Sequence, residues 1–217
     1  MPGRAGEGWR RRSNAFTLIE MLVVLAIVMV ITASVLVSSN QFNGSILLRS
    51  LASQIGLSMR EAQLYGVSVK QVTVAGASGE QQFNSTYGVY VNAATVYQPK
   101  GTYYLFADVN QNGVYDPGEE VETFHLQNGF TISNICAESG TTYSCSHDCS
   151  FTPPAGTSCT ASPFNWLTVS FTRPDPNANF ATDAGAGNYT GALLVVKAPS
   201  GGTRMVSVSK TGLISIL

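Results

Sequence analysis

The stretch FTLIEMLVVLAIVMVITASVLV, residues 16–37, decides the fold of this chain. Its 22 residues contain a single charged side chain, Glu20. At about 1.5 Å per residue, a helix of this length reaches across the roughly 30 Å hydrocarbon core of a bilayer. An acid inside a membrane span is costly unless it has a partner. The stretch therefore predicts a transmembrane helix in which Glu20 has a specific role.

Charge is distributed unevenly around this apolar run. Four arginines and one acid, Glu7, precede it. From residue 16 onward, 12 − 4 = 8 basic and 13 − 1 = 12 acidic residues remain, a formal charge of −4. The arginines favour a cytoplasmic N-terminus with the rest of the chain exported. The mildly acidic body argues against general nucleic-acid binding, and no specific nucleic-acid partner is expected.

A cleaved secretory signal is the simpler alternative for the N-terminal segment. It predicts a shorter apolar core followed by a small-residue cleavage site, which TASVLVSS, residues 32–39, could supply. That alternative gives no reason for Glu20.

The residues RRRSNA followed by FTLIEMLVVLAIV resemble the class III leader of type IV pilins and type II secretion pseudopilins. In that family a basic leader is cut before a Phe, the new N-terminus is methylated, and a Glu occupies the fifth mature position. The resemblance implies that a prepilin peptidase cuts between Ala15 and Phe16, that Phe16 is N-methylated, and that Glu20 acts in assembly. Ala15 departs from the family, which usually has Gly there, so slower cleavage is expected.

The resemblance also implies a partner for Glu20. Cleavage creates a cationic α-amine at Phe16, and in a helical stack of subunits the carboxylate of one chain can face the amine of its neighbour. The alternative is that Glu20 snorkels to the lipid headgroups. The implied partners are other pilin subunits, the prepilin peptidase and an inner-membrane assembly platform. The chain would lie in the inner membrane before assembly and in an extracellular or periplasmic filament afterwards.

The helix is expected to continue beyond the membrane. Apolar residues recur at spacings of three and four along residues 45–66, with polar residues between them. They are Leu48, Leu51, Ile55, Met59 and Ala62. No Pro occurs between residues 16 and 66, and Gly66 is a reasonable stop. One helix is therefore predicted over residues 16–66, with its transmembrane part at 16–37 and a cleaved leader at 1–15.

Residues 67–217 have the sequence pattern of a β-rich globular domain. Nine short runs rich in β-branched and aromatic residues are predicted strands: 67–74, 86–91, 101–108, 120–126, 130–136, 166–172, 191–198, 204–210 and 212–217. An antiparallel sheet packed on the amphipathic half of the helix gives an α+β fold. Residues 175–190 and 137–163 are interpreted as surface loops. The ending TRMVSVSKTGLISIL resembles the closing hairpin of H-type minor pseudopilins and related minor pilins.

Four cysteines, Cys136, Cys145, Cys149 and Cys159, define a loop at residues 136–159. In an exported chain they predict two disulfides. Three pairings are possible, and the nested one, with Cys136 joined to Cys159, is preferred. Zinc is the rival because His147 lies between two cysteines, but the paired C-x-x-C spacing of zinc sites is missing.

The stretch DVNQNGVYDPGE, residues 108–119, fits the twelve-position calcium-loop template. The template positions 1, 3, 5, 7, 9 and 12 fall on Asp108, Asn110, Asn112, Val114, Asp116 and Glu119. Strands rather than helices flank it, which predicts a calcium loop in a β setting. The alternative is a polar turn, since Asn-Gly and Pro-Gly are common turn formers.

Catalysis finds little support in this sequence. There are two histidines, no G-x-S-x-G elbow and no Walker loop. We therefore expect a structural subunit of a type IV pilus, major or minor, and no enzyme. A minor pseudopilin of a type II secretion system is the alternative, and a membrane-tethered exported enzyme or receptor is a distant one.

Overall fold

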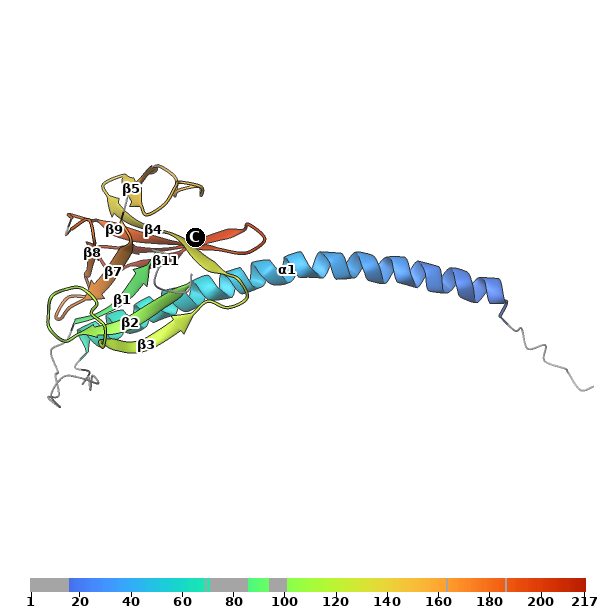
Figure 1. The fold of residues 1–217 in the computed structure, drawn as a ribbon, viewed down its shortest axis with the longest axis horizontal. Helices are drawn as coiled ribbons and strands as arrows, with labels where there is room; N and C mark the ends of the chain where they lie inside the picture. Colours follow the sequence, from blue (N-terminus) through green and yellow to red (C-terminus); the bar gives the residue numbers. More distant parts are fainter. Residues whose placement is uncertain (1–15, 69, 71–85, 94–100, 163, 186) are drawn as a thin grey trace, which may run out of the picture. The chain divides into compact units, whose positions relative to one another are not determined.

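The computed structural model describes residues 16–68, 70, 86–93, 101–162, 164–185 and 187–217. The predicted leader, residues 1–15, lies outside these residues. These described residues form one long helix and eleven strands. The α+β fold class is confirmed (Figure 1). Two compact units are present, residues 1–42 and residues 43–217, and each is described by itself below.

Helix α1 spans Leu18–Val67. Thr17 caps its N-terminus, because the Glu20 backbone N–H donates to Thr17 Oγ1 at 3.3 Å. The helix does not end at Gly66 through a left-handed cap, because Gly66 lies inside the last turn and has no positive φ. Gly66 is required instead for close packing, since a Cβ there would lie 2.4 Å from the carbonyl oxygen of Phe171.

Five antiparallel strands form the first sheet of residues 43–217, in the order β3-β2-β1-β7-β8. In chain order they are β1 Thr86–Asn92, β2 Thr102–Asp108, β3 Glu120–His125, β7 Trp166–Phe171 and β8 Ala178–Thr182. The central strand β1 pairs with β2 and β7, which places Tyr90 between Tyr104 and Thr168.

Six strands form the second sheet, in the order β11-β10-β9-β4-β5-β6. In chain order they are β4 Thr131–Ser139, β5 Thr142–Cys145, β6 Ser158–Ala161, β9 Gly191–Lys197, β10 Thr203–Ser209 and β11 Ile214–Ile216. All pairs are antiparallel except β5 with β6, which is parallel. The single antiparallel sheet expected from the sequence is therefore wrong, and two sheets share the core.

The main core lies where the two sheets meet the part of α1 that belongs to residues 43–217. Four members of the predicted apolar stripe are buried there: Leu48, Ile55, Met59 and Ala62. Leu51 is only partly buried, and Ala52 is fully buried in its place. Helix and first sheet are also joined by a hydrogen bond between Ser58 Oγ and Tyr103 Oη at 3.2 Å.

Both predicted surface loops contain strands. Within residues 175–190, β8 buries alternate side chains, Ala178, Phe180 and Thr182, so the loop interpretation of that segment is wrong. Strands β5 and β6 lie in the second predicted loop. The predicted strand at 67–74 begins in the last residue of α1, and most of it lies outside the described residues.

All four cysteines are disulfide-bonded, but not in the nested pairing. The bonds join Cys136 to Cys145 and Cys149 to Cys159. The β4–β5 hairpin explains the difference, because its register places Cys136 directly opposite Cys145 with a Cα–Cα distance of 4.0 Å. Cys159 Sγ lies 3.4 Å from Cys145 Sγ, so the two bridges are neighbours.

Candidate functional site

The first half of α1 is an apolar surface without a covering layer of its own. Leu18–Leu36 has 19 residues, a mean hydropathy of 2.7 and no buried residue. Among the described residues this is the one helix long and apolar enough to cross a membrane. Thr32, one of its few polar residues, donates its hydroxyl hydrogen to helix carbonyls of Val28 and Met29. The surface therefore presents almost only hydrocarbon.

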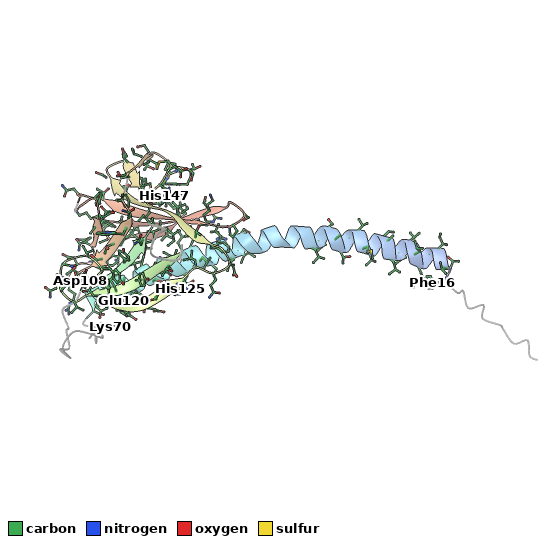
Figure 2. The ribbon with its side chains drawn as sticks, viewed as in Figure 1. Phe16, Lys70, Asp108, Glu120, His125 and His147 are labelled. Carbon is green, nitrogen blue, oxygen red and sulfur yellow. A yellow bond between two sulfur atoms is a disulfide. The ribbon has the colours of Figure 1, made fainter. Side chains whose placement is uncertain are left out.

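Glu20 is the exception on this surface. It lies in the first turn of α1, where a carboxylate interacts favourably with the helix dipole. The sequence has no Lys, Arg or His between Phe16 and Leu48, so the span cannot supply a basic partner. Phe16, labelled in Figure 2, precedes the helix and is 77% exposed. A partner for Glu20 must come from the N-terminal amine, from lipid headgroups or from another chain.

A second exposed apolar surface lies on residues 43–217, where α1 borders β11. Two adjoining cavities, of about 240 and 540 Å³, share Arg60 and Ile214 in their lining. We call them together the α1–β11 groove. Its rim carries Leu57, Leu64 and Leu213, each about two-thirds exposed. Sequence reasoning missed this groove, although the seven-residue spacing of Leu57 and Leu64 was a signal that both lie on one helix face.

The predicted calcium loop connects β2 to β3, and Figure 2 labels Asp108 and Glu120 at its two ends. Asp108 and Glu119 are 1% and 6% exposed. Both carboxylates accept hydrogen bonds from backbone N–H groups of the loop. The Asn112 and Gly113 N–H groups donate to Asp108 at 3.1 and 2.8 Å. The Val109 and Asp116 N–H groups donate to Glu119 at 2.9 and 3.0 Å.

The remaining predicted ligands converge on Asp116. The side-chain amides of Asn110 and Asn112 both donate to Asp116 Oδ2, each at 2.7 Å. Burial raises the pKa of Glu119, and the charge of Asp108 adds to that increase, whereas the backbone N–H groups oppose it. In the part of the chain that the structure describes, no three His, Cys, Asp or Glu side chains form a metal-binding group on their own. Any metal here would also need amide and carbonyl oxygens.

Residues 10–36 match a family model described as the prokaryotic N-terminal methylation motif. Together with the apolar first half of α1, this match supports the type IV pilin and pseudopilin family, whose members begin with a class III prepilin leader. The motif implies processing by a prepilin peptidase, membrane anchoring before assembly, and assembly into a pilus-type filament. Comparisons with curated proteins and with solved structures gave no match. The match therefore supports a subunit of the type IV pilin or pseudopilin type.

The 108–119 loop is fixed to the first sheet by Tyr115. Its ring stacks on Tyr104 with centroids 5.3 Å apart, and its centroid lies 4.5 Å from that of Tyr90. The Tyr115 hydroxyl donates to the Glu120 carboxylate, and burial raises the pKa of Tyr115. The loop therefore has a fixed position on the sheet edge.

The cysteines of residues 136–159 have a structural role and supply no thiolate ligand. Cys136 and Cys145 are buried in a small core with Tyr143 and Phe151 on the second sheet. Zinc coordination by cysteine requires free thiolates, and the four sulfurs are consumed in the two disulfides. His147 is exposed, with its Nδ1 3.2 Å from Ser146 Oγ.

Proposed function

We propose that this chain is a structural subunit, major or minor, of a type IV pilus, and that it assembles through the apolar first half of α1. The observation that carries the proposal is the fully exposed Leu18–Leu36 surface joined to the methylation motif. An apolar surface of this length requires a cover. Lipid would provide it before assembly, and the helices of neighbouring subunits would provide it in the filament.

Glu20 gives this assembly its register. After cleavage between Ala15 and Phe16, the α-amine of Phe16 is cationic below its ordinary pKa of about 8. In a low-dielectric helix bundle, a carboxylate of one subunit gains most by pairing with the amine of another, since neither charge has water around it. A purely apolar span could slide along its neighbours, whereas a paired charge favours one position.

The α1–β11 groove would extend the contact into the globular part. Leu57 and Leu64 project from the helix, and Leu213 projects from the turn before β11, so the groove offers an apolar edge along residues 43–217. We assign its occupant as a second copy of this chain. Filament packing brings such copies together along their helices, and the groove lies on the same helix as the anchor.

The alternative is a minor pseudopilin of a type II secretion system. It is favoured by the closing hairpin of β10 and β11, which pairs Val206 with Ile216 and Val208 with Ile214 at the position where H-type pseudopilins are expected to have one. Sheared surface filaments separate the two functions. A pilus subunit is found in them by mass spectrometry, and a secretion pseudopilin is missing from them.

The test of assembly is Glu20→Ala, with Glu122→Gln as a matched loss of one exposed acid on β3. The Glu20→Ala chain should still enter the membrane and be processed, because the apolar span is intact, but its incorporation into filaments should fall at least about tenfold, as for the loss of a well-formed charge pair. Electron microscopy and quantitative mass spectrometry measure the two effects. Normal incorporation of the Glu20→Ala chain would refute the pairing.

The groove is tested separately by Leu57→Glu and Leu213→Glu. Val121→Glu is the control, because Val121 is also exposed and apolar but lies on β3, away from the groove. Filament yield should fall for the two groove variants and remain unchanged for the control. Equal yields for all three would remove the groove from the assembly interface.

A further inference from the structure

Two buried acids, Asp108 and Glu119, stand at the ends of the 108–119 loop. Asp108 and Glu119 are almost completely removed from solvent. Backbone N–H groups of the loop donate hydrogen bonds to both carboxylates. Buried charges in proteins are normally paired or coordinate metals. Backbone N–H groups stabilise carboxylates through their dipoles, but they carry no net positive charge, which a bound metal ion would supply.

Three other oxygen-bearing residues of the loop lie next to one another. Asn110, Asn112 and Asp116 meet through two hydrogen bonds to one carboxylate oxygen. Gly113, at the sharp-turn position of the twelve-residue template, has a φ of 78°, which glycine adopts without strain. A Cβ at Gly113 would have no atom within 4 Å, so there is room for a side chain. Glycine is favoured at this position because of its positive φ and not because of steric crowding.

We propose that the 108–119 loop binds one calcium ion. Asp108, Asn110 and Asn112 would supply side-chain oxygens, Val114 its backbone carbonyl, Asp116 an oxygen directly or through water, and Glu119 both carboxylate oxygens. The set is entirely hard oxygen, which suits calcium and not the softer transition metals. Its irregular mixture of carboxylate, amide and carbonyl suits the flexible coordination of calcium better than the strict octahedron of magnesium.

Binding requires a small local rearrangement. The amide nitrogens of Asn110 and Asn112 now face Asp116, so both amides must turn their oxygens toward the ion. Tyr115, between the ligands Val114 and Asp116, is stacked on Tyr104 and fixes the loop backbone. The bound ion would therefore lie against the first sheet. Its binding should change the near-ultraviolet spectrum of the aromatic cluster formed by Tyr90, Tyr104 and Tyr115.

Calcium binding is independent of the filament proposal, so its test uses the unassembled, detergent-solubilised full chain freed of metal with a chelator. Calorimetric titration should give one site with a dissociation constant on the order of 10⁻⁴ to 10⁻³ M, as in extracellular calcium modules. The near-ultraviolet signal of the aromatic cluster should saturate with the same constant. Magnesium at about 10 mM, tenfold above the weaker end of that range, should reproduce neither signal.

Two variants and one control decide the outcome. Glu119→Gln removes the expected bidentate ligand and should weaken binding at least about tenfold. Asp116→Ala should also weaken it and places no new group in the core, because Asp116 is only half-buried. It therefore decides the case if Glu119→Gln fails to fold. Glu122→Gln, an exposed acid on β3, should bind as the parent chain does. No calcium heat in the parent chain, or equal weakening in all three variants, would overturn the proposal.

Discussion

Replacing Gly66 with Ala tests how tightly the end of α1 packs on β7. A Cβ at this position would lie 2.4 Å from the carbonyl oxygen and 2.9 Å from the Cβ of Phe171, both closer than atoms in contact allow. The obstacle includes strand backbone, which cannot rotate away. Helix propensity alone would favour Ala by about 1 kcal/mol. Overpacking costs about 1–3 kcal/mol, and a clash with strand backbone lies in the upper part of that range, about 2–3 kcal/mol. The clash should therefore outweigh the propensity and leave a net loss of about 1–2 kcal/mol.

Gly56→Ala is the matched control on the same helix. A Cβ there would lie 3.4 and 3.6 Å from side-chain atoms of Ile216, which is ordinary van der Waals contact. The propensity gain of up to about 1 kcal/mol should then remain. For a chain of this size, 1 kcal/mol moves Tm by about 2–4 °C. Gly66→Ala should lower Tm by about 2–8 °C, and Gly56→Ala should raise it by up to about 4 °C.

The measurement is thermal unfolding of the detergent-solubilised full chain, followed by near-ultraviolet circular dichroism. That signal reports the aromatic side chains of residues 43–217, where both glycines lie. The test is that the two variants shift Tm in opposite directions, because detergent and protein concentration affect the Tm of both variants alike. A Tm for Gly66→Ala equal to or above that of the parent would refute the close packing of α1 on Phe171.

Three further predictions concern processing, redox state and pH. Intact-mass measurement of the processed protein should give a chain beginning at N-methyl-Phe16, and a retained leader or a cut near residue 38 would contradict this. The oxidised chain should have no reactive thiol. After limited reduction, a thiol reagent should label Cys149 and Cys159 before the buried pair Cys136 and Cys145, since Cys149 is exposed and Cys159 is half-buried. The reverse order would contradict the assigned burial. Burial raises the pKa of Tyr103 to about 12, so the folded state favours the neutral phenol. The preference of the folded state for the neutral Tyr103 phenol therefore adds to stability in full below pH of about 10, and this stabilisation is lost as pH rises toward 12. Alkaline unfolding should therefore be less steep in Tyr103→Phe, and an unchanged pH profile would contradict the assignment.

The anchor and the helix stripe could be predicted from sequence because both depend on local pattern. An uninterrupted apolar run and a spacing of three and four need no knowledge of distant residues. The stripe differs in one detail, since Ala52 is more buried than Leu51. The helix packs against two sheets and not one, so its buried face is wider than the five predicted positions and includes Ala52.

The strands and bridges that were missed depend on partners far away in the chain. β8 reads as a loop because its residues are small and polar, yet pairing with β7 buries Phe180. The nested disulfide pairing was predicted wrongly because strand β5 was not predicted. The register of β4 and β5 places Cys136 opposite Cys145. Such pairings belong to the sheet and are not encoded in any short window.

The distribution of apolar residues on α1 links the fold to assembly. Between residues 43 and 67 the helix is apolar on two sides, but the sheets cover only the side with Ile55 and Met59. Leu57 and Leu64 remain about two-thirds exposed, which a surface helix serving only its own core would not need. Leu213 adds to the same exposed edge from the turn before β11. A second apolar side is costly in solubility unless another chain covers it. In the assembly that we propose, the same helix holds the core with one side and contacts a neighbouring subunit with the other, as Leu18–Leu36 would along its whole length.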